Sequence, residues 1–166
     1  MIPHWKLATL RTAQDVILRP LMPYDVTPAY VEGLNDPKVH EFMTTKKHDL
    51  ASVWAYVTEN WNDPCAILFG IHARVFIGTL RLHYIVEGAS ATMGICIFDR
   101  RYWGMGIAVG AIRRVVEFAI KELHLIEINA GMEAGNIPSQ RAFERAGFTR
   151  IEDKSAALQY RWSKAA

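Results

Sequence analysis

Residues 95–112 read ICIFDRRYWGMGIAVGAI and are the most informative part of the chain. The first four residues predict a strand, and a short loop with Gly104 and Gly106 then leads into a helix. Glycines in such a loop let the backbone approach a ligand closely, because no Cβ stands in the way. The free N–H groups at the start of the helix favour an anion such as phosphate. A tight strand-to-helix turn without a ligand would use the same glycines, so both interpretations stay open at this point.

Two other phosphate-binding loops do not fit these residues. The loop lacks the Gly-Lys-Ser/Thr ending of a Walker loop. A dinucleotide fingerprint needs a GxGxxG pattern in a βαβ unit, and Gly104, Gly106 and Gly110 miss that spacing. The strand before the loop also belongs to a run of antiparallel strands.

Residues 136–148, which read NIPSQRAFERAGF, form a second motif. Each piece has a local explanation, with Gly147 as a helix C-cap and Phe148 as a core residue. One helix and one strand separate this motif from the Gly104 loop. At this spacing the two motifs resemble the two signatures of the GNAT superfamily of acetyl-CoA-dependent N-acetyltransferases. The resemblance extends roughly from Val16 to Trp162.

Two shorter segments narrow the resemblance to one branch. Residues 102–106 (YWGMG) and 30–37 (YVEGLNDP) are similar to the ribosomal-protein N-terminal acetyltransferases and their relatives in polysaccharide and antibiotic gene clusters. The preferred register aligns Gly106 and Ala108 with the small residues of the loop motif, and Trp103 then replaces its usual Arg or Gln. The competing register restores an Arg at position 101 but leaves the helix start one turn late.

The resemblance implies a binding site for acetyl-CoA. The pyrophosphate would lie on the glycine loop, and the pantetheine arm would bond like an added strand near Ile95–Phe98. The implied binding residues are Ile97, Phe98, Trp103, Gly104, Met105, Gly106, Ile107, Ala108, Asn136 and Ser139. Asn136 would bond the pantetheine arm, and a helix cap is its alternative role.

The reaction implied by the resemblance is direct attack of a neutral amine on the thioester. Relatives often carry a Glu in the strand where this chain has Thr92, so the proton must take another route. Glu133 is the candidate base, with His83 or a chain of waters as alternatives and a structural role open for both side chains. Phe143 stands where many members have a Tyr, so Ser139 is the candidate donor to the leaving thiolate. Its alternative role is to cap the helix over 137–146.

The order of the expected elements indicates an α/β fold. The resemblance makes it a GNAT-like, mostly antiparallel mixed central sheet with a splayed cleft and helices on both faces, in a single domain over residues 1–166. Strands are expected at 16–19, 66–72, 76–85, 91–98, 125–130, 148–152 and 157–162, with 6–11 as a further candidate. In the strand 76–85, Leu80 and Leu82 alternate with Arg81 and His83. Helices are expected at 23–33, where Asp25 is the start signal, and at 49–61, 109–123 and 137–146, with a short helical turn opened by Asp36 and Pro37. The 3–4 spacing in the helix 49–61 predicts an apolar face of Leu50, Val53, Trp54, Val57 and Trp61.

Composition limits the partners. The formal net charge of +2 and the absence of any long basic run argue against a nucleic-acid-binding protein. The pair Arg100–Arg101 could still face an anion. Cys65 and Cys96 lie in apolar runs without CxxC spacing, which predicts buried thiols, no metal site and a reducing compartment. The N-terminal residues lack the h-region of a signal peptide, and no apolar run could span a membrane, so a cytoplasmic location is expected.

The acceptor is the least constrained part of the prediction. We expect a small-molecule amine, with an amino sugar favoured and a peptide or protein N-terminus second, and a monomer or homodimer. Side chains considered for the acceptor wall are Trp54, Trp61, Arg81, His83 and Tyr84. Since both usual side-chain catalysts are missing, a non-catalytic acyl-CoA-binding module is the alternative.

Overall fold

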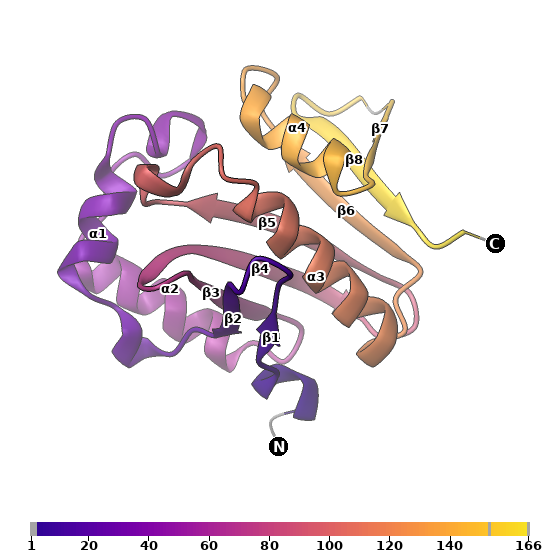
Figure 1. Ribbon diagram of the computed structural model, residues 1–166, viewed down its shortest axis with the longest axis horizontal. Coiled ribbons are helices and arrows are strands. Elements are labelled where there is room, and N and C mark those ends of the chain that lie inside the picture. The colour runs from indigo at the N-terminus through magenta and orange to yellow at the C-terminus, as the bar shows by residue number, and fades with distance from the viewer. Residues whose placement is uncertain (1–2, 153, 166) are drawn as a thin grey trace.

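The computed structural model describes residues 3–152 and 154–165. In this part of the chain an eight-stranded sheet has the order β1-β2-β3-β4-β5-β6-β8-β7 (Figure 1). The strands are β1 (Leu10–Arg11), β2 (Ile17–Pro20), β3 (Ile67–His72), β4 (Phe76–Val86), β5 (Ser90–Ile97), β6 (Glu127–Met132), β7 (Thr149–Ile151) and β8 (Leu158–Ser163).

Neighbouring strands are antiparallel except for β5 and β6. The parallel pairing of β5 and β6 covers three residue pairs and ends at Thr92 and Asn129. Both strands continue past this point, β5 to Ile97 and β6 to Met132, but they no longer pair with each other. The mostly antiparallel sheet with a splayed cleft is therefore confirmed.

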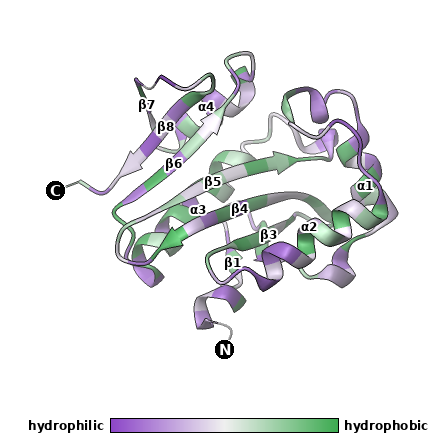
Figure 2. Cartoon of the chain, turned by 180° about the vertical axis from the view of Figure 1, so that it is seen from behind, coloured by the Kyte–Doolittle hydropathy of each residue, from purple (hydrophilic) through white to green (hydrophobic). Residues whose placement is uncertain are grey.

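Helices cover both faces of the sheet. The helix α3 lies in front of the sheet in Figure 1, whereas α2 lies in front of it in the reverse view of Figure 2. The α-helices are α1 (Pro28–Asn35), α2 (Leu50–Asn62), α3 (Ile107–Glu122) and α4 (Ile137–Arg145), and short 3₁₀ helices are η1 (His4–Leu7), η2 (Pro23–Asp25), η3 (His40–Phe42) and η4 (Arg100–Tyr102).

The side chains of β3 and β4 alternate between two cores. On β3, Phe69 joins the larger cluster with α3 and α4, while Leu68 joins the smaller cluster with α1 and α2. On β4, Leu80 and Leu82 are fully buried in the larger cluster, which confirms the alternation expected from the sequence. Arg81 therefore points to the opposite face, toward α1 and α2.

The first helix differs from the prediction of a helix over 23–33 with Asp25 at its start. Asp25 instead forms an ion pair with Arg19, with 2.6 Å between the guanidinium and the carboxylate. The α-helix begins at Pro28, after Thr27, whose hydroxyl accepts a hydrogen bond from the Tyr30 N–H at 3.3 Å. The Asp25 carboxylate also accepts from the Met22 N–H at 2.8 Å, so this side chain is engaged before α1 begins, and Thr27 is the cap.

The short helical turn expected after Asp36 is present. The Asp36 carboxylate accepts from the Lys38 N–H at 2.8 Å, the Asp36 carbonyl accepts from the N–H groups of Val39 and His40 at 2.9 and 3.0 Å, and η3 follows. The N-terminal strand differs from the prediction. Within 6–11, the strand is confined to Leu10–Arg11, because η1 occupies His4–Leu7.

Two burial predictions were wrong. Leu50 and Trp54 of α2 are about half exposed, at 49% and 52%, because the buried face of this helix is formed by Val53 and Val57 together with Asn60. Cys65 is exposed and Cys96 is partly buried, so only the second thiol lies in the interior.

The cap at Thr27 predicts a local stability effect. Replacing the hydroxyl in Thr27→Ala leaves the Tyr30 N–H without its acceptor, so the free energy of unfolding should fall by about 1 kcal/mol. Thr58→Ala is the control, since Thr58 is partly buried in the interior of α2, where its hydroxyl donates to the Trp54 carbonyl and caps no helix N-terminus, and its change should stay within about 0.5 kcal/mol. Urea denaturation measures both, and equal losses in the two variants would contradict the assigned cap.

Candidate active site

The gap between β5 and β6 is a cavity of about 570 Å³, which we call the cleft. Its walls come from β5, the loop before α3, the end of β6, the first turns of α4 and the segment 38–43. A volume of this size suits a small-molecule ligand or cofactor.

The glycine loop forms one end of the cleft. Gly104 and Gly106 both line it and have φ values of +73° and +76°, a backbone region that side chains with a Cβ rarely adopt. Gly106 is also the N-cap of α3, so no side chain caps the first N–H groups of that helix. The same two glycines therefore make the tight turn and expose the helix N-terminus to the cleft, where an anion would be favoured.

The edge of β5 faces the gap. The Phe98 N–H donates to the Ile77 carbonyl at 3.0 Å, so the alternation of an antiparallel pair turns the backbone groups of Ile95 and Ile97 away from β4. The Ile97 carbonyl accepts a hydrogen bond from Nε1 of Trp103 at 2.8 Å. Trp103 therefore fastens the glycine loop to the end of the strand.

The structure brings together most of the residues expected to bind the cofactor. The expected cofactor residues that line the cleft are Ile97, Trp103, Gly104, Gly106, Ile107, Ala108 and Asn136. Glu133, the candidate base, lines it as well. Phe98 does not, because it is buried with its ring 5.0 Å from those of Tyr30 and Phe76. Met105 is exposed outside the cleft, and its carbonyl accepts from Nε2 of Gln14.

Asn136 and Ser139 meet at the start of α4. The Asn136 side chain caps this helix by accepting from the Ser139 N–H at 3.3 Å, so the alternative in which Ser139 is the cap is wrong. Ser139 is partly buried and is not one of the side chains lining the cleft, although Pro138 and Ala142 are. Phe143 is buried against Phe148, with ring centroids 5.0 Å apart.

A second cavity of about 630 Å³ lies on the other face of β5, between the sheet and the segment containing α1, η3 and α2. We call it the acceptor pocket, because Arg81 and His83, two side chains that the sequence suggested for an acceptor wall, line it. The two cavities share five lining residues: Phe42, Met43, Gly94, Ile95 and Cys96. A Cβ added at Gly94 would meet nothing within 4 Å, so this glycine leaves open space on the wall that both cavities share.

Polar side chains of β4 line the acceptor pocket. Arg81 lies over the Tyr56 ring, with 5.7 Å from the guanidinium carbon to the ring centroid. Burial, and secondly the charge of Arg81, lower the pKa of His83 to about 4, so this imidazole is neutral at pH 7. Of the wall residues expected from the sequence, Arg81 and His83 are present in the pocket lining, whereas Trp54, Trp61 and Tyr84 are not.

Cys96 places a thiol, which could act as a nucleophile if ionised, at the junction of the two cavities. Burial raises the pKa of its thiol to about 12. The thiol therefore stays protonated at neutral pH and is a poor nucleophile.

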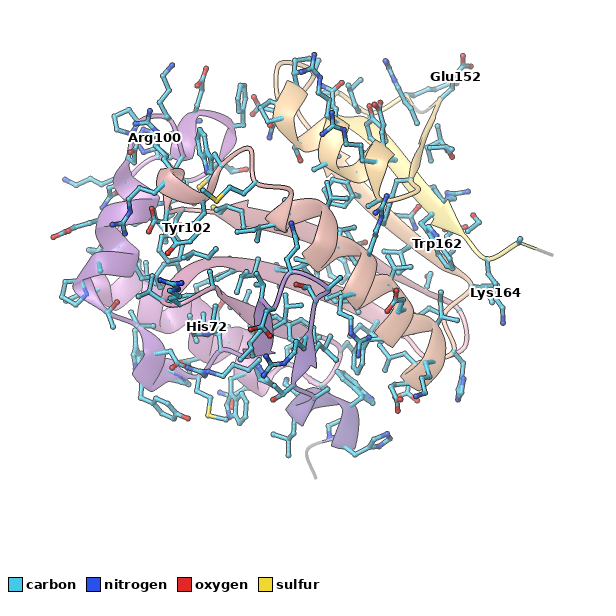
Figure 3. The ribbon with its side chains drawn as sticks, in the orientation of Figure 1. His72, Arg100, Tyr102, Glu152, Trp162 and Lys164 are labelled. Atoms are coloured by element: carbon cyan, nitrogen blue, oxygen red, sulfur yellow. The ribbon has the colours of Figure 1, made fainter. Side chains whose placement is uncertain are left out.

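Several cleft residues were not anticipated from the sequence. Tyr102 lines the cleft beside the loop after β5 (Figure 3), although it stands in the motif that identified the loop. Basic side chains of Lys38, Arg141 and Arg145 also line the cleft, from segments far apart in the sequence. The pair Arg100–Arg101 does not: Arg100 pairs with Asp36 at 3.3 Å and Arg101 with Asp99 at 2.6 Å.

Residues 3–152 and 154–165 contain no group of three His, Cys, Asp or Glu side chains arranged to hold a metal ion. Among the helices formed by these residues, none combines the length and the apolar character needed to cross a membrane.

Comparisons with known proteins agree with this architecture. A family model described as an acetyltransferase (GNAT) domain matches residues 15–149. The chain is 44% identical to the probable N-acetyltransferase YjcK of Bacillus subtilis (strain 168) over 89 residues, which are 52% of this chain and 49% of that protein. The match thus spans about half the length of this curated relative.

Two solved structures share the fold at low sequence identity. RimJ of Mycobacterium smegmatis, in complex with CoA-disulfide, superposes with a TM-score of 0.75 at 22% identity, covering 98% of this chain and 90% of that one. The aminoglycoside acetyltransferase AAC(6')-Ib, in complex with coenzyme A, has a TM-score of 0.78 at 17% identity, covering 90% and 95%. Because the family model matches residues 15–149, which are most of this chain, the chain belongs to the GNAT family of acetyltransferase domains.

Proposed function

We propose that residues 1–166 act as one N-acetyltransferase domain that transfers an acetyl group from acetyl-CoA to a primary amine in a ternary complex. The observation that carries this proposal is the meeting of two cavities on the β5 segment Gly94–Cys96. A thioester reaching this segment from the cleft would be exposed to an amine in the acceptor pocket. Holding both reactants in this way replaces an encounter in solution by a reaction between oriented neighbours.

Acetyl-CoA is proposed to occupy the cleft. Its pyrophosphate would accept hydrogen bonds from the loop and the first turn of α3, where the helix dipole favours negative charge. Lys38, Arg141 and Arg145 add positive charge to walls that also contain Glu41 and Glu133. The pantetheine amides match the unpaired strand edge at Ile95, and the complexes of two structural neighbours with CoA species support the same use of the fold.

The pKa of Cys96 favours direct transfer over an acetyl-enzyme. A covalent route would need a thiolate at the junction, and this thiol is protonated at neutral pH. In the direct route the amine nitrogen attacks the thioester carbon, the C–S bond breaks, and CoA leaves as a thiolate. The proton lost by the amine is proposed to leave through Glu133 or water. Ser139 does not itself line the cleft but directly follows Pro138, which does, and we propose that its hydroxyl turns toward the bound cofactor and donates a hydrogen bond to the thiolate.

A small amine, such as an amino sugar, is the proposed acceptor, with a protein N-terminus second. An acceptor pocket of about 630 Å³ with aromatic walls supports a small molecule. The second candidate function is a non-catalytic acyl-CoA-binding module, favoured by Thr92 and Phe143 at positions where relatives often carry catalytic Glu and Tyr side chains.

Thiol release from acetyl-CoA separates the two candidates. With a panel of primary amines, the proposed enzyme should release free CoA at a rate that depends on both protein and amine. Calorimetry with CoA is run beside it. Tight CoA binding without amine-dependent release would support the binding module and contradict the proposed activity.

A matched pair of glycine variants tests the loop. Gly104→Val places a branched side chain where the pyrophosphate is proposed to lie, so the Kd for CoA should rise ten-fold or more, equivalent to about 1.4 kcal/mol. Gly88→Val is the control, because Gly88 has nearly the same φ (+75°) and lies outside the cleft, and because a Cβ added at either glycine would meet no atom within 4 Å. Both variants should lose similar stability in a thermal melt, but Gly88→Val should keep its CoA affinity. Equal affinities of the two variants would reject the proposed binding loop.

Ser139→Ala tests the proposed donor to the thiolate. Losing one hydrogen bond to a developing charge costs about 1.5–3 kcal/mol, so kcat at saturating acetyl-CoA should fall about ten- to hundred-fold. The melting temperature should hardly change, because Asn136 and not Ser139 supplies the capping side chain. A variant with unchanged kcat would remove Ser139 from the mechanism.

A further inference from the structure

We propose that the acceptor amine carries an anionic group, a carboxylate or a phosphate, and that Arg81 binds this group in the acceptor pocket. This inference rests on the proposed function, because it names the class of amine that the same site would acetylate. The starting observation is the charge of the pocket. Arg81 is a fixed positive charge in its lining, and no Asp or Glu is among the described residues that line it.

Arg81 stands at the point where an acceptor would meet the thioester. It pairs with Gly94 across β4 and β5, and Gly94 belongs to the wall shared by both cavities. Side chains of directly paired residues lie on the same face of the sheet. The guanidinium therefore extends over the acceptor-pocket face beside the open space at Gly94.

No carboxylate among the described residues forms an ion pair with Arg81. Its Nε atom is buried without a hydrogen-bond partner, and its guanidinium carbon lies 5.7 Å from the centroid of the Tyr56 ring. Arg19, by contrast, makes two hydrogen bonds to the Asp25 carboxylate, at 2.6 and 2.9 Å. Since buried polar groups in folded proteins are normally paired, the unpaired Nε of Arg81 is suited to an external anion.

Neighbouring side chains supply neutral hydrogen-bonding groups and no second fixed charge. His83 is neutral at pH 7, and its Nδ1, like Nε2 of His48, is buried without a partner. Asp63 is the carboxylate whose charge raises the pKa of His83, against the larger effect of burial, and it does not line the pocket. The hydroxyl-bearing residues of the lining are Thr44, Thr45, Ser52, Thr79, Tyr30 and Tyr56.

This arrangement selects among small amines. A guanidinium binds a carboxylate or phosphate through two parallel hydrogen bonds, and the strength of these bonds rises in a partly desolvated pocket. A polycationic amine would bring further positive charge next to Arg81 with no acidic side chain in the lining to receive it. The pocket therefore favours an amine whose second functional group is acidic.

The test compares amines that differ only in the anionic group. Suitable pairs are ethanolamine with phosphoethanolamine, glucosamine with glucosamine 6-phosphate, and an amino acid with its amide, with kanamycin as a polycation. The full chain is assayed by thiol release from acetyl-CoA, and kcat/KM is measured for each amine. In at least one pair the anionic member should be preferred ten-fold or more, mainly through a lower KM.

Arg81→Gln should reduce this preference to a ratio near one, because glutamine keeps much of the length of the side chain but not its charge. Arg74→Gln is the matched control, since Arg74 is exposed in the turn between β3 and β4 and lies outside both cavities. Arg74→Gln should keep the preference. Equal use of both members of every pair, a preference for kanamycin, or a preference that survives Arg81→Gln would overturn the inference while leaving acetyl transfer intact.

Failure of the proposed function gives a different result. If no amine causes thiol release, the anionic amines are titrated calorimetrically into the CoA-bound protein. Binding that weakens ten-fold or more in Arg81→Gln but not in Arg74→Gln would support the anion site without acetyl transfer. An absence of binding by any anionic amine would overturn the site as well.

Discussion

Hydrogen bonding between β5 and β6 stops after three residue pairs, and the geometry of the site depends on this loss. Beyond Thr92 and Asn129 the backbone groups on the facing edges have no partner across the gap, and apart from the Ile97 carbonyl, which accepts from Trp103, they are available to water or a ligand. The same divergence carries β5 into the glycine loop and β6 into the N-terminus of α4. A continuous sheet would bury these strand ends against each other and leave no cleft.

β5 separates two chemically different spaces. Its edge and the loop after it offer N–H groups and glycine backbone to the cleft, which suits phosphates and amides. Its other face joins Arg81 and His83 of β4 in a pocket with few charges. The backbone of Gly94 could carry a side chain without strain. Because it carries none, the junction between the two cavities stays open at this residue.

Local sequence chemistry predicted much of this arrangement. The glycine loop, the alternation of Leu80 and Leu82 with Arg81, and the motif at 136–148 depend on neighbours close in sequence, and most expected cofactor residues line the cleft. Tertiary packing decided the remaining features. Asp25 pairs with Arg19 whereas Thr27 caps α1, and the exposure of Trp54 depends on which face of α2 meets the sheet. That Arg81 has no ion-pair partner could not be predicted either, because the residues around it come from several segments of the chain.

The residues that line only one of the two cavities come mostly from different parts of the chain. Apart from the shared residues, the acceptor pocket is built from residues that precede Gly94, and the cleft is built mainly from residues that follow it. Mutations in the segment 44–56 can therefore alter one cavity without touching the glycine loop or α4. This separation gives the domain an evolutionary modularity, in which acceptor choice can diverge among descendants that retain the same donor. It also makes exchange of that segment between relatives a practical route to redesigning specificity.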